Sequence, residues 1–195
     1  MPALLNRTLF CAVLAGAAQP PDLTAQLDGA IPSMRLVSGT LSFDGHATVG
    51  DFTGTTTTVT GEMTGGESLA AVRGWVEAPV KTLDTGDGKR DKDLNKSMES
   101  SKHPAMRFDL AGVTPEGAPA DTAAVHLQGK LTLHGVTRDV TLPGRVWKEG
   151  AALRLRSDFP LDLSDYEIGG LTKLLGMLRM QEEIEVHVAL TFAPR

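Results

Sequence analysis

Apolar and polar residues alternate with a period of two along most of the chain. In the clearest stretch, residues 125–133, every second residue is Val, Leu or Gly and the residues between them are polar. This is the pattern of strands that bury one face and expose the other to water. The alternation recurs at 72–80, 106–110, 140–146, 153–163 and 184–192, with weaker strands expected at 41–43 and in the threonine-rich stretch 52–63.

These segments predict an all-β fold of eight or nine antiparallel strands. The stretches 134–139 ("HGVTRD") and 148–152 ("KEGAA") are short enough for hairpin turns, and no long helix is predicted that could cover a sheet. Strands buried on one side then form either a sandwich or a closed barrel. Gly74, Gly129 and Gly144 fall on the inward positions and favour the strongly coiled strands of a barrel.

Two segments break the alternation. Residues 84–102 are dense in charge, and Leu94 and Met98, four residues apart, share one face of a helix. We therefore expect a short amphipathic helix there, capped by Asp84 or Asp87, with its charges in water and its apolar face over the barrel or its entrance. The second segment, 169–180, is rich in leucine, favours a helix, and is expected to flank the mouth.

Composition and charge narrow the function classes. The chain has 195 residues, of which 41% are hydrophobic and 22% charged, with a formal net charge of −5. This is enough for one ordinary domain with its own core. A nucleic-acid partner is not expected, because phosphate binding needs clustered Lys and Arg. No glycine-rich phosphate loop follows a predicted strand, so nucleotide binding has no support either.

The first 18 residues have the features of a secretory signal peptide. Arg7 is followed by the short apolar run 8–14 and by small residues at 15–17. The alternative is a buried N-terminal helix, which Pro20 would end. The run is too short to span a bilayer, so stable membrane insertion is not expected. We divide the chain into a signal peptide at 1–18, which contains the single cysteine, and a barrel domain at 22–195.

Three stretches resemble a known family: "LDTGDGKRDKDL…HPAMRF", "GKLTLHGVTRDVTLP" and "SDFPLDLSDYEIGG…EEIEVHVALTF". They resemble the YceI-like family over roughly residues 35–192. The resemblance implies an eight-stranded, lipocalin-like antiparallel barrel with one or two short helical segments. It also implies an exported protein that holds a polyisoprenoid chain or a related amphiphile, such as a quinone tail, inside the barrel. Two stretches, "MRLVSGTLSFDG" and "SMESSKHP", depart from the family pattern where a ligand would enter.

A pocket inside such a barrel would be lined by the inward positions and by the two irregular segments. For Phe108 and Phe159 an ordinary core role is an equal alternative, because pocket wall and core share one face. Trp75 has the parity of the outward residues. The expected pocket residues are Phe43, Val76, Val80, Leu94, Met98, Met106, Phe108, Leu131, Leu142, Phe159, Leu161, Tyr166, Leu171, Leu174, Leu175 and Leu178.

Catalytic and metal chemistry have little support in the sequence. The five histidines show no metal-binding spacing, so we expect no metal site, no cofactor and no catalytic residue. The groups that an enzyme could use, Asp84, His103, His134 and Tyr166, are scattered along the chain.

The expected function is a periplasmic or secreted binding protein that carries or sequesters an isoprenoid-like or quinone-like lipid. The alternatives are an enzyme that acts on a small amphiphile in the same cavity and a ligand-free, stress-related scaffold. A homodimer through a strand edge or the leucine-rich segment 169–180 is a further expectation, since exposed apolar patches tend to pair.

Overall fold

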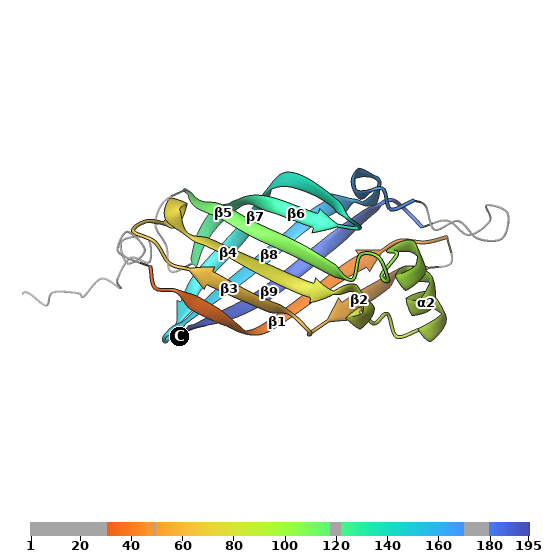
Figure 1. Cartoon of the computed structure of the whole chain (residues 1–195), viewed down its shortest axis with the longest axis horizontal. Coiled ribbons are helices and arrows are strands. Elements are labelled where there is room, and N and C mark those ends of the chain that lie inside the picture. Colours follow the sequence, from red (N-terminus) through yellow and green to blue (C-terminus); the bar gives the residue numbers. More distant parts are fainter. Residues whose placement is uncertain (1–30, 49, 118–121, 170–179) are drawn as a thin grey trace, which may run out of the picture.

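Nine strands form one antiparallel sheet that curls round and closes on itself (Figure 1). The computed structural model describes residues 31–48, 50–117, 122–169 and 180–195. The strands are β1 (Met34–Gly45), β2 (Phe52–Thr56), β3 (Thr60–Thr64), β4 (Arg73–Pro79), β5 (Ala105–Glu116), β6 (Thr122–Leu133), β7 (Val136–Glu149), β8 (Ala152–Asp162) and β9 (Glu183–Pro194).

The barrel closes where β1 pairs with β9, from Met34 opposite Pro194 to Asp44 opposite Glu185. On its other edge β1 pairs first with β3 and then with β2, so these two short strands share one position in the wall. The nine strands therefore fill eight positions of a closed antiparallel barrel. The predicted fold class is confirmed, and the sandwich alternative is excluded.

The register of the strands explains why alternation produced this fold. Val76 on β4 lies opposite Phe108 on β5, which lies opposite Leu131 on β6, and these apolar residues share the inner face. One residue away, Asp109 lies opposite Lys130 on the outer face. A shift of one residue would move every apolar side chain into water, so the pattern fixes the pairing.

Two of the predicted strands are shorter than the alternation suggests. β4 ends at Pro79, and Val80 begins a 3-10 turn, η2 (Val80–Thr82); β8 ends at Asp162, and Leu163 begins η3 (Leu163–Tyr166). A third turn, η1 (Leu69–Ala71), precedes β4. The alternation continued by chance into these turns, so periodicity alone could not locate the strand ends.

The charged segment contains the helix α2 (Gly88–Ser97), which lies at one end of the barrel (Figure 1). The Asp87 carboxylate accepts hydrogen bonds from the backbone N–H groups of Lys89 and Arg90, as an N-cap does. These donors, Arg90 first, hold the pKa of Asp87 below its ordinary value. Leu94 and Met98 are each only 8% exposed. The predicted amphipathic helix is thus confirmed, with Asp87 rather than Asp84 as its cap.

Two predictions fall outside the described residues: the signal peptide at 1–18 and most of the leucine-rich segment, residues 170–179. Among the helices in the described ranges, none combines the length and the apolar character that crossing a membrane requires.

A histidine bridges three strands beside the line where the barrel closes. His187 on β9 lies between Asp158 on β8, 2.7 Å from its Nδ1, and Asp44 on β1, 3.2 Å from its Nε2. Only the protonated ring can donate both hydrogen bonds. Asp158 first, and then Asp44, raise the pKa of His187 above its ordinary value. The Thr53 hydroxyl donates to Asp44 and is the main reason why the pKa of that carboxyl is lowered.

The His187→Gln substitution should therefore destabilise the protein more in acid than in base. The folded state holds this proton more tightly than the unfolded state, so its contribution is complete below the unfolded pKa of about 6.5 and is lost as the pH rises through the folded value. The loss should stay below about 1 kcal/mol, because the three side chains are partly exposed. Urea unfolding of the wild type and of His187→Gln at pH values of about 5.5 and 8.5 measures this loss of unfolding free energy.

His126→Gln is the matched control, because His126 has one acidic neighbour, Glu116, at 3.5 Å. If His187→Gln lowers the free energy of unfolding by the same amount at both pH values, the proposed role of the proton is contradicted.

Candidate functional site

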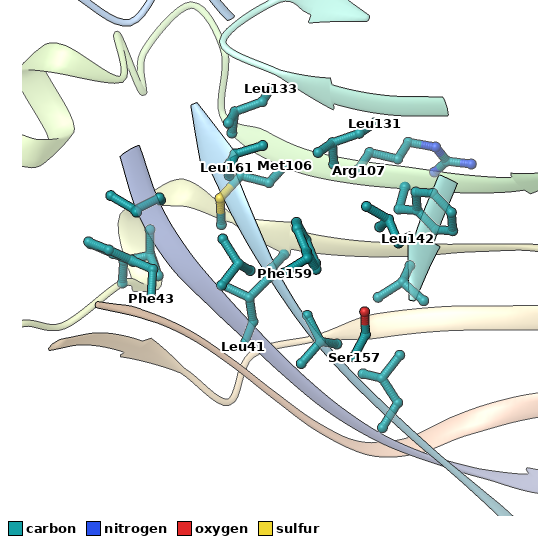
Figure 2. A pocket seen from close by; sticks show the side chains of 18 of the residues that line it. Leu41, Phe43, Met106, Arg107, Leu131, Leu133, Leu142, Ser157, Phe159 and Leu161 are labelled. Atoms are coloured by element: carbon teal, nitrogen blue, oxygen red, sulfur yellow. The ribbon is translucent and has the colours of Figure 1, made fainter. Parts of the chain in front are cut away.

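A cavity of about 510 Å³ occupies the interior of the barrel. Its wall is mostly apolar and takes side chains from the strands around it. Figure 2 shows Leu131, Leu142 and Phe159, from β6, β7 and β8, pointing into the same space. Several of these inward side chains are only half-buried although they face away from the outer surface, because they border the hollow: Leu41, Val76, Met106, Phe108, Leu131, Leu142 and Leu161.

Glycines on neighbouring strands make room for two aromatic rings of the wall. A Cβ at Gly54 would lie 2.3 Å from the Phe43 ring, and one at Gly129 would lie 2.7 Å from the Phe108 ring. Each ring thus covers the backbone of the adjacent strand and stays close to the wall. Because Gly54 and Gly129 have no side chains, the two rings can lie against the wall, and the centre of the barrel stays open.

A cap formed by residues 83–104, with α2 in its middle, closes one end of the cavity. Leu83, Leu94 and Met98 of the cap line the hollow. Backbone hydrogen bonds tie the beginning of the cap to β2, because Asp84 and Thr55 exchange bonds of 2.8 and 2.9 Å. At the other end, the Val80 N–H donates to the Pro104 carbonyl at 2.9 Å. The cap is therefore fastened on both sides.

The cap also rests on an aromatic pair. The Arg90 guanidinium lies 4.4 Å from the centre of the Phe52 ring, and the Phe52 and Phe43 rings meet edge to face with centroids 6.0 Å apart. Cation–π and edge-to-face contacts each stabilise such an arrangement by about 0.5–1.5 kcal/mol. A charged residue of α2 is thereby linked to a side chain of the cavity wall.

Charged residues gather at the end of the cavity that the cap covers. They come from the β1–β2 connection and from α2: Asp51, Asp87, Lys89, Arg90 and Asp93. Two other charged residues near the wall, Glu62 and Arg107, are held by partners on the outer face, Arg195 for the first and Asp109 with Glu77 for the second. The cavity thus has an apolar body and one polar end.

Ten of the sixteen predicted pocket residues line the cavity: Phe43, Val76, Leu94, Met98, Met106, Phe108, Leu131, Leu142, Phe159 and Leu161. Contact with a ligand stays a prediction for each of them. Leu171, Leu174, Leu175 and Leu178 lie outside the described residues. The two described residues at the ends of that segment, Ile168 and Met180, do line the cavity.

The expectation that Val80 and Tyr166 line the pocket is wrong. Val80 is 1% exposed and Tyr166 is 2% exposed, and both are packed in the core cluster beside Leu94 and Met98. Both belong to 3-10 turns, where the strand alternation no longer decides which way a side chain points. Burial raises the pKa of the Tyr166 hydroxyl.

Trp75 faces outward as its parity predicts. Its neighbour there is Arg107, whose guanidinium lies 4.7 Å from the indole centre. Sequence reasoning missed the polar end of the cavity, above all Asp51 and Arg90. The signal was present in "GKRDKDL", because a charged helix that covers an opening must present some of its charges at the rim.

The groups considered for catalysis do not meet in the cavity. Asp84, His103, His134 and Tyr166 are absent from its lining among the described residues. Asp84 lies beside β2, whereas His103 and His134 lie together with ring centroids 5.1 Å apart, and the Tyr166 carbonyl is 3.1 Å from His134 Nδ1. The histidine spacing along the sequence gave no indication of this grouping.

The fold and the site together define a closed antiparallel barrel around one apolar cavity with a polar end. The chain belongs to the YceI-like domain family, which matches residues 34–192. No curated protein sequence matches it.

Solved structures share the fold at low sequence identity. BcnA of Burkholderia cenocepacia is 17% identical, with 78% of this chain and 95% of that chain covered and a TM-score of 0.66. A polyisoprenoid binding domain of Saccharophagus degradans is 14% identical, with 85% of this chain and 100% of that chain covered and a TM-score of 0.67. A YceI protein of Campylobacter jejuni is 16% identical, with 61% of this chain and 70% of that chain covered and a TM-score of 0.50. These structures confirm the expected fold, and the family model confirms the expected family.

The Gly54→Val substitution should disturb the wall of the cavity. Its side chain would displace the Phe43 ring, which lies 2.3 Å from the position of a Cβ there. Overpacking of this kind costs about 1–3 kcal/mol of unfolding free energy. Chemical denaturation measures the loss. Gly88→Ala is the control, because its Cβ would meet nothing within 4 Å, and we expect unchanged or slightly higher stability. Wild-type stability of Gly54→Val would refute the described packing of Phe43.

Proposed function

We propose that this protein binds an isoprenoid-like or quinone-like lipid in the barrel and carries or sequesters it outside the cytoplasm. The single observation that carries the proposal is the apolar cavity of about 510 Å³ inside a closed barrel of the YceI-like family. The structural neighbour from Saccharophagus degradans, described as a polyisoprenoid binding domain, supports the same ligand class.

The size of the cavity suits a lipid tail. If a methylene group takes up about the volume of a water molecule, roughly 30 Å³, the cavity of about 510 Å³ holds roughly 15–20 carbons. Burial of each CH₂ contributes roughly 0.8 kcal/mol, or about 12–16 kcal/mol in total. This exceeds the estimated cost of association, about 4–15 kcal/mol, over most of its range. The surplus from apolar contact can thus provide most of the affinity.

The polar end would receive the head group. Asp51, Lys89, Arg90 and Asp93 offer both signs of charge there, so a polar head could find donors and acceptors at the rim while its tail lies among Leu131, Leu142 and the other wall residues.

A binding role is favoured over catalysis because of the lining. Most charged residues of the described lining lie at the rim, and Glu62 and Arg107 are held by ion-pair partners on the outer face. The hydroxyl of Ser157, which lines the wall, donates to the Pro143 carbonyl. A ligand-free scaffold is less consistent with a hollow of this volume.

Export to the periplasm or beyond is supported by the signal-like residues 1–18. A homodimer stays a prediction.

Protein purified from its native host should carry an isoprenoid or quinone-like lipid. Native mass spectrometry should show the chain with a noncovalent adduct, and extraction with organic solvent should release a lipid that mass spectrometry identifies. An empty cavity under native conditions would support the scaffold instead. Turnover of a small amphiphile that disappears when Asp84, His103, His134 or Tyr166 is replaced would support an enzyme.

Leu142→Trp should block binding. The indole would fill space that the ligand tail needs, because Leu142 lines the cavity from β7. We expect the affinity for tritiated geranylgeraniol to fall at least about tenfold, or about 1.4 kcal/mol. Thr141→Trp is the matched control, since Thr141 is the preceding residue on β7 and is exposed on the outer face. Equal binding by wild type and both variants would place the lipid elsewhere.

A further inference from the structure

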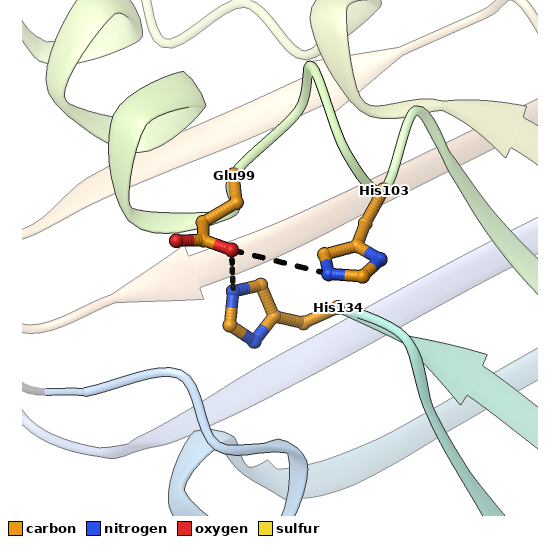
Figure 3. Close-up of side chains that lie close together, drawn as sticks. All are labelled: Glu99, His103 and His134. Atoms are coloured by element: carbon orange, nitrogen blue, oxygen red, sulfur yellow. Dashed lines mark ion pairs between the residues drawn. The ribbon is translucent and has the colours of Figure 1, made fainter.

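Three potential metal ligands meet where the end of the cap approaches the β6–β7 connection, outside the cavity lining (Figure 3). They are Glu99, His103 and His134. One ligand atom from each lies within 4.8 Å of the others, and within the described ranges this is the only group of three or more His, Cys, Asp or Glu side chains so arranged. The lipid-binding proposal does not use any of the three.

The turn that follows α2 places the first two side chains on one face. The Glu99 carbonyl accepts hydrogen bonds from the N–H groups of Lys102, at 2.7 Å, and of His103, at 3.0 Å. A bond from residue i+4 to residue i makes one helical turn, so side chains at 99 and 103 come close together. Glu99 Oε2 lies 3.9 Å from His103 Nε2.

A tight hairpin brings in the third side chain. His134 and Gly135 form the two-residue connection between β6 and β7, with φ angles of 52° and 80°. Positive φ at both positions is typical of the type I′ turn. The His103 ring packs against Gly135 so closely that a Cβ there would lie 2.4 Å from it. The absence of a side chain at this position lets the two loops meet.

The hydrogen bonding of His134 prepares it as a ligand. Its Nδ1 lies 3.1 Å from the Tyr166 carbonyl, which can only accept, so Nδ1 carries the proton. In the neutral ring the lone pair is then on Nε2, which is buried without a hydrogen-bond partner. A ligating histidine nearly always donates its other N–H to a carbonyl or carboxylate in this way. The orphaned Nε2 faces Glu99 Oε2 at 3.9 Å.

We propose that Glu99, His103 and His134 form a binding site for a divalent transition-metal ion of the zinc type. With metal–ligand bonds of about 2.0–2.2 Å, the ligand atoms of a tetrahedral site lie about 3.3 Å apart. Glu99 Oε2 lies 3.9 Å from the Nε2 atom of each histidine, and all three ligand atoms lie within 4.8 Å of one another. Metal binding therefore needs a contraction of these side chains, two of which, Glu99 and His103, are partly exposed. Two imidazoles and one carboxylate suit zinc and its neighbours rather than calcium or magnesium.

The three protein ligands would leave one coordination position for water. The side chains of Glu99 and His103 are 43% and 32% exposed, which gives an ion access from solvent. Lys102 currently donates to Glu99 Oε2 at 2.9 Å, but its side chain is 70% exposed and can swing away. A bound ion would connect the turn after α2 to the β6–β7 hairpin and so fasten the cap to the barrel wall.

The test is a zinc titration of the purified chain by calorimetry. Every protein carries Cys11→Ser, so that the single thiol cannot serve as a ligand. We expect one Zn²⁺ per chain, with affinity at least about 100-fold weaker in Glu99→Gln and in His103→Gln, since even loss of an outer-shell partner costs about 10–100-fold. These two positions are preferred because His134 also bonds to Tyr166 and its replacement could impair folding.

His126→Gln is the matched control, because His126 on β6 is a partly exposed histidine with one neighbouring carboxylate, Glu116 on β5. It should bind zinc like its parent. Zinc should also raise the unfolding temperature and slow the amide exchange of residues 99–103 in the parent but not in the two ligand variants. Absence of stoichiometric binding would overturn the proposal, as would unchanged affinity in both ligand variants or an equal loss in the control. None of these outcomes depends on a lipid.

Discussion

The pairing of β1 with β9 is the constraint on which the rest of the structure depends. An open sheet with one apolar face needs a cover, and the described part of this chain has no long helix to provide it. Closure turns the apolar face toward itself and removes both free edges of the sheet. Eight positions set an interior just wide enough for side chains or one small ligand. Here glycines hold Phe43 and Phe108 against the wall, and a hollow is left.

A hollow barrel needs an end that is apolar inside and polar outside, and the charged segment meets this need. Asp87 starts α2, Leu94 and Met98 enter the cavity, and the intervening charges face the rim or water. Residues 83–104 are held by hydrogen bonds to β2 at one end and to η2 at the other, so a short helix keeps its place although an isolated one of this length would be marginal. The density of charge in the middle of a β-rich chain is therefore a consequence of closing a cavity.

Alternation predicted the strands, the inward residues and the barrel because period two decides which face a side chain occupies. Its failures at Val80 and Tyr166 have the same origin, since both lie in 3-10 turns beyond strand ends. Contacts between loops could not be predicted at all. Glu99 and His134 are separated by a complete hairpin, and only the closed barrel shows that the turn after α2 reaches the β6–β7 connection.

The cavity and the histidine group share one segment of chain, which has a thermodynamic consequence. Met98 lines the cavity, and Glu99, the next residue, faces His103 and His134. A cation that fixed Glu99 would restrict the movement of Met98, and a ligand that displaced Met98 would move Glu99. Coupling between two binding equilibria is reciprocal, so each occupant would change the affinity of the other by the same factor. The sign of this coupling depends on where the ligand lies. A ligand that fits beneath the closed cap strengthens metal binding, whereas a ligand that displaces the cap weakens metal binding.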